Sequence, residues 1–304
     1  LMGTANFLKN TQSNYATPAI EVVTKCLVTN TTPVSAYRGA GRPEGNYFME
    51  RLIEAAAAET GRDANDLRRL NHIKPGQMPF HAASGSDYDG GEFTALLDEA
   101  LSRADAAGFP ARRAESESRG LLRGLGIGNF LECTAPPTKE QGGIRFEKDG
   151  TVTIITGTLD YGQGHWSPFA QVLHQQLGIP FASIRLVQGD SDQLVAGGGT
   201  GGSKSVMASG AAIIEASAKV VEKGREAAAF FLETAAADIE FEPHADTGEG
   251  RFLIAGTDRG LGIMELAARL RAQDALPEDV PPTLDVTHVF DQAPQAYPNG
   301  CHVC

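Results

Sequence analysis

Apolar residues in the first third of the chain recur at the three- and four-residue spacing of helices. One such stripe is formed by Leu52, Ile53, Ala56 and Ala57. It predicts a helix that begins near Pro43, a residue suited to a first turn, and that stops at Gly61. Two shorter helices are predicted over residues 63–70, capped by Asp63, and 92–107.

The segments around these helices are predicted to be extended or irregular. The run Val22–Asn30 is typical of a strand, and the charged stretch Arg112–Arg119 is predicted to be a linker. After this stretch, alternation of apolar and polar positions replaces the helical spacing. The first 118 residues therefore differ in pattern from the remainder.

The second part of the chain predicts strands and helices in mixed order. Strands are expected over residues 120–129, 144–146, 151–156, 184–187 and 283–290, with a hairpin over 239–255. Helices are expected over residues 167–177, ended by Gly178, and over 203–233 and 263–272. The long helix is expected to bury Ala211, Ile214, Ala218 and Val221. This order predicts an α+β (mixed α/β) fold without internal repeats.

Composition narrows the classes of ligand and partner. The chain is 41% hydrophobic, yet no apolar run approaches the roughly 18 residues of a membrane helix, which predicts a soluble globular protein without a membrane span. A formal net charge of −12 argues against a nucleic-acid surface. Local backbone donors would therefore have to hold any anionic ligand. The 35 glycines are the residues that can bring the backbone close to one.

The four cysteines are too few and too scattered for a disulfide scaffold or an iron–sulfur set, which favours a reducing compartment. The run Cys301–Cys304 contains half of a zinc-type ligand set, but no second ligand pair exists, and its alternation suits the edge of a sheet. We expect no protein-ligated metal. No basic region followed by an apolar one opens the chain, so we expect a cytoplasmic protein. The abrupt ends predict a piece of a longer polypeptide.

Two glycine-centred loops precede predicted helices. In Ala36–Glu44, two glycines allow close backbone approach, and Arg38 and Arg42 supply positive charge. In Asp160–His165, amide N–H groups and the Gln163 side chain can meet a polar ligand in front of a capped helix. Both segments are also consistent with ordinary strand-to-helix turns, and a lone His165 is more typical of a turn than of a ligand.

The third loop, Gly197–Ser205, gives the strongest local signal. Five glycines lead into a long predicted helix, an arrangement that forms an anion-binding nest at the positive end of the helix dipole. The spacing does not match the phosphate-binding loop of nucleotide triphosphatases, because Ser203 precedes Lys204. The alternative, a flexible glycine linker, is disfavoured because a predicted strand and a predicted helix flank the run.

The three loops together resemble one family. The motifs are Tyr37-Arg-Gly-Ala-Gly-Arg-Pro-Glu44, Glu50-Arg-Leu-Ile53, Asp66-Leu-Arg-Arg-Leu-Asn71, Gly162-Gln-Gly-His165, Gly189-Asp-Ser-Asp192 and Gly199-Thr-Gly-Gly-Ser-Lys-Ser205. In order and spacing they are similar to the large subunit of the xanthine oxidase, aldehyde oxidase and carbon monoxide dehydrogenase family. The resemblance extends from about Val22 to Cys304. It implies two partial molybdenum-cofactor-binding domains, over residues 1–118 and 119–304.

The resemblance implies a molybdenum cofactor, molybdopterin, usually extended as a cytosine dinucleotide in bacterial members. By similarity, Arg38, Gly39 and Ala40 would lie beside the metal, and Gly162, Gln163 and Gly164 would contact the pterin. The residues expected to hold the dinucleotide or pterin phosphate are Gly201, Gly202, Ser203, Lys204 and Ser205. Implied partners are a small-molecule substrate, an iron–sulfur subunit or domain and an FAD subunit or domain, and a homo-oligomer is left open.

In this family a metal-bound hydroxide attacks an electron-poor carbon while a glutamate takes a proton. The resemblance places that glutamate beyond Cys304, so we expect no catalytic residue here and an inactive isolated chain. Hydroxylation by this polypeptide alone would contradict that expectation. Copper-type carbon monoxide dehydrogenases carry cysteine where this chain has Gly39. An aldehyde or N-heterocycle hydroxylase is therefore favoured over a carbon-monoxide-dehydrogenase-like subunit.

Two other classes of protein stay open. A non-catalytic cofactor-storage or scaffold protein would contain stoichiometric pterin without passing electrons to an acceptor. An unrelated acidic nucleotide-binding enzyme would use the nest at Gly197–Ser205 for a different nucleotide. Metal analysis for molybdenum, together with mass spectrometry of any released nucleotide, separates these classes.

Overall fold

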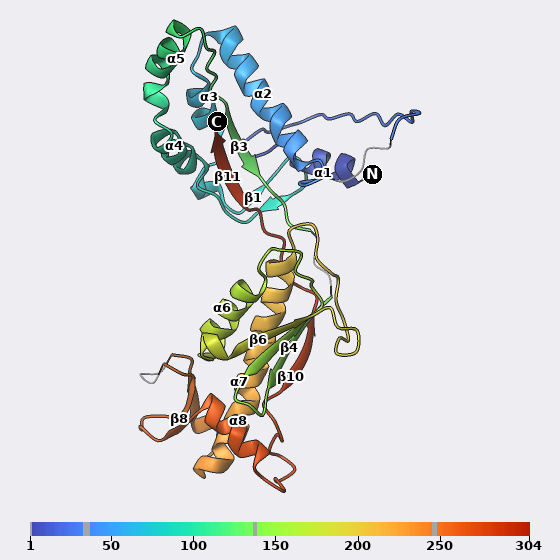
Figure 1. Ribbon diagram of the computed structural model, residues 1–304, viewed down its shortest axis with the longest axis vertical. Helices are drawn as coiled ribbons and strands as arrows, with labels where there is room; N and C mark the ends of the chain where they lie inside the picture. Colours follow the sequence, from blue (N-terminus) through green and yellow to red (C-terminus); the bar gives the residue numbers. More distant parts are fainter. Residues whose placement is uncertain (1, 33–36, 136–138, 245–247) are drawn as a thin grey trace. The chain divides into compact units, whose positions relative to one another are not determined.

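The computed structural model describes residues 2–32, 37–135, 139–244 and 248–304. The chain divides into two compact units, unit 1 with Leu1–Thr134 and Ala296–Cys304, and unit 2 with Ala135–Gln295. Each unit has a hydrophobic core of its own. Figure 1 labels the α-helices and several of the strands of both.

Unit 1 is mainly helical. Its α-helices are α1 (Met2–Asn10), α2 (Arg42–Thr60), α3 (Ala64–Asn71), α4 (Phe93–Arg103) and α5 (Phe109–Ser118). Two short 3₁₀ turns, η1 (Pro75–Gln77) and η2 (Ala106–Gly108), connect them. A small hairpin is formed by β1 (Phe80–His81) and β2 (Asp87–Tyr88), and β3 (Ile127–Leu131) pairs antiparallel with β11 (Asn299–Val303).

The amide side chain of Asn46 attaches α2 to the outer edge of β3. The N–H of Leu131 donates to Asn46 Oδ1 at 3.2 Å, and Asn46 Nδ2 donates to the Leu131 carbonyl at 3.1 Å. Asn46 thus pairs with both backbone groups that Leu131 turns away from β11, and Asn10 Nδ2 also donates to the Leu131 carbonyl, at 2.7 Å.

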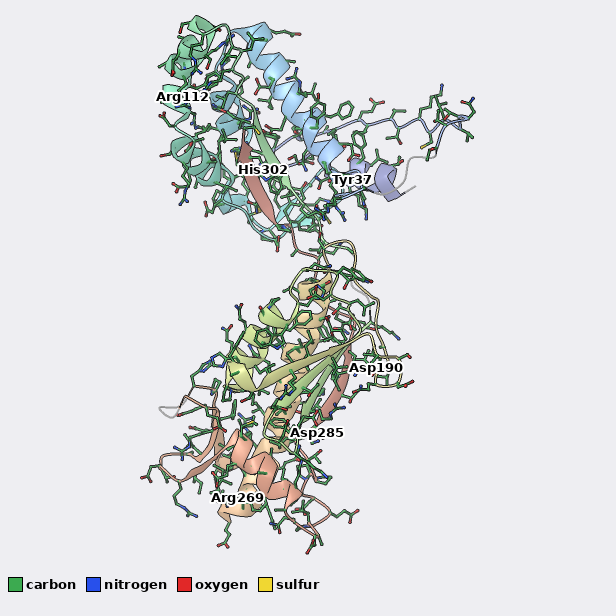
Figure 2. The ribbon with its side chains drawn as sticks, in the orientation of Figure 1. Tyr37, Arg112, Asp190, Arg269, Asp285 and His302 are labelled. Carbon is green, nitrogen blue, oxygen red and sulfur yellow. The ribbon has the colours of Figure 1, made fainter. Side chains whose placement is uncertain are left out.

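Unit 2 is built on a four-stranded sheet in the order β10-β4-β5-β6. Its strands are β4 (Glu140–Phe146), β5 (Val152–Thr156), β6 (Ile184–Gln188) and β10 (Val286–Phe290). β5 and β6 are parallel and are joined through α6 (Trp166–Leu177) and the turn η3 (Phe181–Ser183), whereas β4 is antiparallel to both β5 and β10. Asp285, labelled in Figure 2, accepts the N–H of Phe146 at 2.8 Å and fixes the entry to β10.

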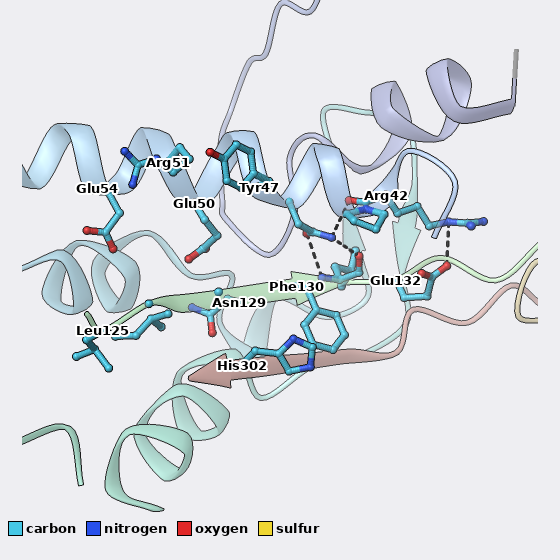
Figure 3. A pocket seen from close by; sticks show the side chains of 16 residues that line it. Arg42, Tyr47, Glu50, Arg51, Glu54, Leu125, Asn129, Phe130, Glu132 and His302 are labelled. Atoms are coloured by element: carbon cyan, nitrogen blue, oxygen red, sulfur yellow. Dashed lines mark hydrogen bonds and ion pairs between the residues drawn. The ribbon is translucent and has the colours of Figure 1, made fainter. Parts of the chain in front are cut away.

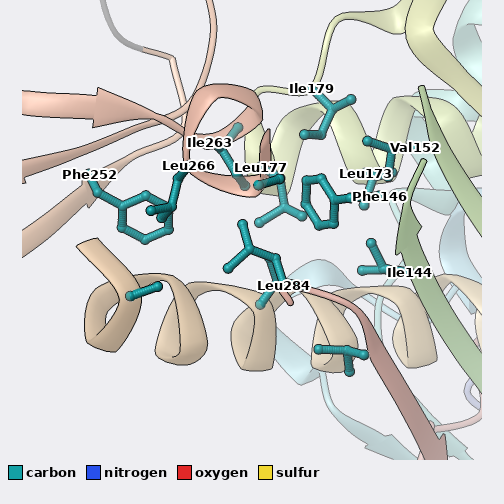
Figure 4. Packing of buried hydrophobic residues seen from close by; sticks show 14 of the residues in the cluster. Ile144, Phe146, Val152, Leu173, Leu177, Ile179, Phe252, Ile263, Leu266 and Leu284 are labelled. Carbon is teal, nitrogen blue, oxygen red and sulfur yellow. The ribbon is translucent and has the colours of Figure 1, made fainter. Parts of the chain in front are cut away.

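The long helix α7 (Ala211–Leu232) packs on this sheet, behind a turn of π-helix, η4 (Val206–Gly210). A Cβ atom at Gly142 would lie 2.1 Å from the Ala212 carbonyl oxygen, so glycine permits the close approach of β4 and α7. The remaining elements are the turn η5 (Ala236–Asp238), the strands β7 (Ile239–Glu242), β8 (Arg251–Ile254) and β9 (Gly260–Gly262), and the helix α8 (Ile263–Arg271). Figure 4 shows the apolar side chains that fill this core, among them Ile144, Leu173, Phe252 and Leu266.

Most predicted elements are present. Gly61 and Gly178 end α2 and α6 in the left-handed conformation, and the Asp63 side chain caps α3. The parallel β5–α6–β6 unit, the hairpin of β7 and β8, and α8 are confirmed. The extended conformation predicted near Cys301 is confirmed as β11.

Four predictions from the hydrophobic pattern were wrong. Val22–Asn30 is not a strand: Val23, Leu27 and Val28 are exposed, and no other described segment pairs with them. Arg112–Arg119 is not a linker, because most of it lies in α5, where Arg113 and Glu117 pair one turn apart. The strand expected over residues 120–129 is present as β3, which is shorter and begins only at Ile127. On α7, Ile214 is 42% exposed, whereas Ile213 and Ala216 are buried.

Candidate functional site

Two of the predicted glycine loops meet at one edge of the unit 2 sheet. β5 and β6 are parallel, with Thr156 opposite Gln188, so the segments that follow them leave from the same edge. The loop at residues 157–165 follows β5, and the loop at residues 189–205 follows β6. Crevices outside the carboxyl ends of parallel strands are common ligand sites in α/β sheets. We call this region the carboxyl-edge site.

The first of these loops uses its own aspartate to occupy its amide donors. The Asp160 carboxylate accepts the N–H groups of Gly162 at 2.7 Å, Gly164 at 3.2 Å and His165 at 2.7 Å. The hydrogen bond from Gly162 is the largest of the effects that hold the pKa of Asp160 below its usual value, and the other two act in the same direction. Gln163 Oε1 accepts the N–H of Tyr161. The predicted presentation of these N–H groups to a ligand is therefore not found here, although Gly162, Gln163 and Gly164 are exposed.

His165 has a structural place in this loop. It stands at the N-terminus of α6, is 3% exposed, and lies 5.3 Å from the ring of Phe169. Because an amide nitrogen can only donate, the 3.2 Å contact makes His165 Nδ1 the acceptor of a hydrogen bond from Gln188 Nε2. The interpretation of His165 as a turn residue agrees with this geometry.

Buried hydroxyl groups form a hydrogen-bonded network next to the two loops. Gln188 Nε2 donates to Thr158 Oγ1 at 2.8 Å, Thr156 and Thr158 lie 3.0 Å apart, and Ser209 Oγ donates to Thr158 at 3.3 Å. Thr156, Thr158 and Ser209 are fully buried. The network connects the ends of β5 and β6 with the π-turn η4. The sequence pattern did not mark these residues, because hydroxyls at strand ends are common and only the fold brings them together.

The loop at Gly197–Ser205 presents backbone donors. Gly201, Gly202 and Ser203 are exposed, and no acceptor among the described residues takes their N–H groups. Gly202 and Ser203 have φ of 64° and 60°, in the left-handed region of the backbone. Thr200 Oγ1 accepts the N–H of Leu159 at 2.9 Å, which links this loop to the one after β5.

The two side chains at the end of this loop are engaged with the protein. Lys204 is 8% exposed, and its Nζ donates to the Gly198 carbonyl at 2.9 Å. Ser205 Oγ donates to Thr200 Oγ1 at 3.3 Å. The buried Lys204 side chain therefore stabilises the loop through its hydrogen bond to Gly198, whereas Gly201, Gly202 and Ser203 face solvent.

The predicted glycine loop that precedes α2 belongs to unit 1. Arg38 and Tyr37 are exposed, and Gly39, Ala40 and Gly41 have φ of 85°, 44° and 98° in front of α2. A Cβ atom at Gly41 would lie 1.9 Å from the Gly3 carbonyl oxygen, so only glycine fits there. Asn6 Nδ2 donates to the Ala40 carbonyl at 3.0 Å, which ties the turn to α1.

Arg42, the second arginine of that loop, is not available as free positive charge. It is buried, and its Nε lies 2.9 Å from Glu132 Oε1. This ion pair stands at one end of a pocket of about 530 Å³ between α2 and β3, shown in Figure 3. Tyr47, Glu50 and His302 also line the pocket. Its mixture of acidic, basic and aromatic groups matches no single ligand class.

Within the described ranges, no group of three or more His, Cys, Asp or Glu side chains is arranged to hold a metal ion. None of the described helices is both long and apolar enough to cross a membrane.

Comparison with known proteins agrees with this architecture. Two family models described as molybdopterin cofactor-binding domains match residues 2–72 and 99–304. Together the two matches cover most of the chain. The chain belongs to the molybdopterin cofactor-binding domain family, which confirms the predicted resemblance and the mixed α/β fold class.

Individual relatives are subunits of dehydrogenases. The chain is 31% identical to the carbon monoxide dehydrogenase large chain of Hydrogenophaga pseudoflava, over 96% of this chain and 37% of that protein. It is 29% identical to subunit gamma of the 6-hydroxypseudooxynicotine dehydrogenase complex of Paenarthrobacter nicotinovorans, over 94% of this chain and 36% of that protein. The chain thus spans little more than a third of these relatives.

A solved structure covers the whole chain. Quinoline 2-oxidoreductase from Pseudomonas putida 86 superposes with a TM-score of 0.84 and 27% identity, over 100% of this chain and 39% of that chain. Both units therefore have counterparts in one known oxidoreductase.

Proposed function

We propose that this chain holds the molybdenum cofactor in the large subunit of a hydroxylase that oxidises an aldehyde or an N-heterocycle with water as the oxygen source. The observation that carries the proposal is the row of exposed amide donors at Gly201, Gly202 and Ser203, at the carboxyl edge of a sheet in a molybdopterin-binding family. Such donors suit a phosphate or another anionic group.

The described residues fit the cofactor. A Cβ atom at Gly162, Gly164 or Gly201 would meet no other atom within 4 Å, so there is space beside both loops. We assign the phosphate end to the amides of Gly201–Ser203, with Lys204 and Ser205 supporting that loop, and the pterin side to Gly162, Gln163 and Gly164. Arg38, Gly39 and Ala40 are assigned to the metal side. When bound, the cofactor supplies the redox centre; these residues bind and orient it.

The finer assignments rest on the relatives. A cytosine dinucleotide form, an iron–sulfur and an FAD partner subunit or domain, a cytoplasmic location and two cofactor-binding domains meeting near residue 118 all remain part of the proposal. The quinoline enzyme favours an N-heterocycle as substrate. The second candidate is oxidation of carbon monoxide, favoured by the 31% identity to a carbon monoxide dehydrogenase large chain but opposed by Gly39 in the first loop.

Cofactor content tests the proposal. The protein is purified from a host that makes molybdenum cofactor, and molybdenum and acid-released cytidine monophosphate are measured per chain. In Ser203→Asp, an added carboxylate faces the amides assigned to phosphate, so both contents should fall at least tenfold. Aspartate tolerates the left-handed conformation of residue 203, so the loop should keep its shape.

A matched control adds the same charge away from the carboxyl-edge site. Ser102→Asp changes an exposed residue of α4 in unit 1 and should leave both contents unchanged. Full cofactor content in Ser203→Asp would refute the phosphate assignment. Absence of molybdenum and nucleotide from the unaltered protein would refute the proposed function itself.

A further inference from the structure

A buried carboxylate lies beneath the carboxyl-edge site. Glu140, the first residue of β4, is 0% exposed. Its Oε1 accepts the N–H of Gly157 at 2.7 Å and that of Gln141 at 3.1 Å. The backbone amide of Gly198 also favours the charged form of this carboxylate and so lowers its pKa. One side chain therefore bonds to the segment after β5 and interacts electrostatically with the glycine run after β6.

At this point the two loops touch backbone to backbone. A Cβ atom at Gly157 would lie 2.3 Å from the Cα of Gly197, and one at Gly197 would lie 2.6 Å from the Cα of Gly157. No side chain fits between them. Any change in the separation of the loops must therefore move the amides that Glu140 holds.

Lys204 holds the same stretch from the other side. Its Nζ donates to the carbonyl of Gly198, the residue whose amide favours the charged form of Glu140, and its positive charge acts on the Glu140 carboxylate. Gly198 thus interacts with a buried anion and a buried cation. Lys204 directly follows the exposed donors at Gly201–Ser203, so its contact with Gly198 restrains these donors from their C-terminal side.

We propose that Glu140 is a positioning residue that sets the spacing between the loops at residues 157–165 and 197–205 and thereby preorganises the cofactor site. The proposal rests on the proposed function for its consequence, but the coupling of the two loops is a property of the protein alone. Burial, the foremost cause, raises the pKa of Glu140, which shows the cost of keeping a carboxylate at this position. Its Oε2 has no hydrogen-bond partner among the described residues.

Hydrogen exchange of the cofactor-free protein tests the coupling. In Glu140→Ala, Gly157 loses its acceptor and the amide of Gly198 loses the nearby carboxylate, so exchange in peptides covering 157–165 and 197–205 should accelerate together, at least tenfold. Peptides covering β5 and α7 should keep their rates. Glu140→Gln retains an acceptor oxygen of the same reach and should restore part of the protection in both loops.

The control is Glu147→Ala, which removes a carboxylate just beyond the opposite end of β4, where it accepts from Arg145 and Thr153. It should leave both loops unchanged. Acceleration in one loop only, uniform acceleration throughout unit 2, or no change in Glu140→Ala would each overturn the positioning role.

Cofactor retention is the second measurement. Glu140→Ala should release molybdenum and nucleotide at least tenfold faster than the unaltered protein, and Glu140→Gln should be intermediate. Unchanged retention together with accelerated loop exchange would overturn the preorganising role. If the unaltered protein contained no cofactor while both loops still responded to Glu140→Ala, the proposed function would fail and the loop coupling would stand.

Discussion

His72 shows how burial of a single side chain makes unit 1 sensitive to pH. The ring is 1% exposed, its Nδ1 lies 3.1 Å from Thr94 Oγ1, and its Nε2 lies 3.3 Å from Asn129 Nδ2. It also stacks on Tyr15, with ring centroids 5.3 Å apart. Burial first, and then the positive charge of Lys74, lowers the pKa of His72 to about 4.

Folding therefore favours the neutral form of the His72 ring. Between about pH 6.5 and pH 4, His72 is protonated in the unfolded chain but not in the folded chain. The free energy of unfolding of unit 1 should therefore fall as the pH falls. The loss from this group should reach about 3 kcal/mol. His72→Gln should lack it, which urea unfolding monitored by hydrogen exchange of unit 1 peptides would show. His302→Gln, at an exposed histidine, should follow the unaltered protein. Identical pH curves for His72→Gln and the unaltered protein would contradict the assignment.

Among the elements, α7 shows where a sequence pattern is ambiguous. Alanines occur on every side of this helix, so the apolar stripe can be drawn along two adjacent faces. The predicted stripe contained Ile214, but β4 and α6 lie against the neighbouring one. Ile213 is fully buried in the unit 2 core, whereas Ile214 is 42% exposed. Helix length is a local property, and the buried face depends on distant partners.

This adjacent pair gives a direct test. Ile213→Ala leaves a cavity in the core and should lower the free energy of unfolding of unit 2 by about 2–5 kcal/mol. Ile214→Ala removes the same atoms from a partly exposed position and should cost about 1 kcal/mol or less. Trp166 is the single tryptophan of the chain and lies in unit 2, so its fluorescence during urea unfolding reports this unit. Equal losses for the two variants would show that the buried face of α7 is misassigned.

The same division between local and distant causes explains which parts of the site were predictable. Glycines that end helices, and a glycine run ahead of a helix, are local signals, so the loops at 157–165 and 197–205 were found. The sequence predicts that Asp160 lies in a loop, but it does not predict that its carboxylate accepts the N–H groups of Gly162 and His165, because those hydrogen bonds depend on the exact geometry of the turn. Glu140 is 17 residues from Gly157, the residue it bonds to. No spacing rule connects them, and only the pairing of β4 with β5 does.

At the scale of the whole molecule, the chain leaves unit 1 at Thr134, forms unit 2 and returns at Ala296. The returning segment pairs with β3 along its whole length, with Gly128 opposite His302. Hydrogen bonds from Glu132 to Pro298 at 2.7 Å and from Thr134 to Ala296 at 3.0 Å continue the ladder to the crossing point. Unit 1 therefore contains residues from two distant parts of the described chain.

His302 offers a test of this closure, because its ring is exposed while its backbone lies within the ladder. The cross-strand bonds of Gly126 with Cys304, both at 2.9 Å, fix the alternation and make Gly128 and His302 a hydrogen-bonded pair. His302→Pro removes the N–H of that pair and should destabilise unit 1 by about 3 kcal/mol. His302→Ala loses only the ring contact with Phe130 and should cost far less. Hydrogen exchange should accelerate at β3 and α4 in the proline variant, while β5 and α7 of unit 2 keep their protection. Equal exchange in the two variants, or equal loss of protection in both units, would show that β11 does not close unit 1.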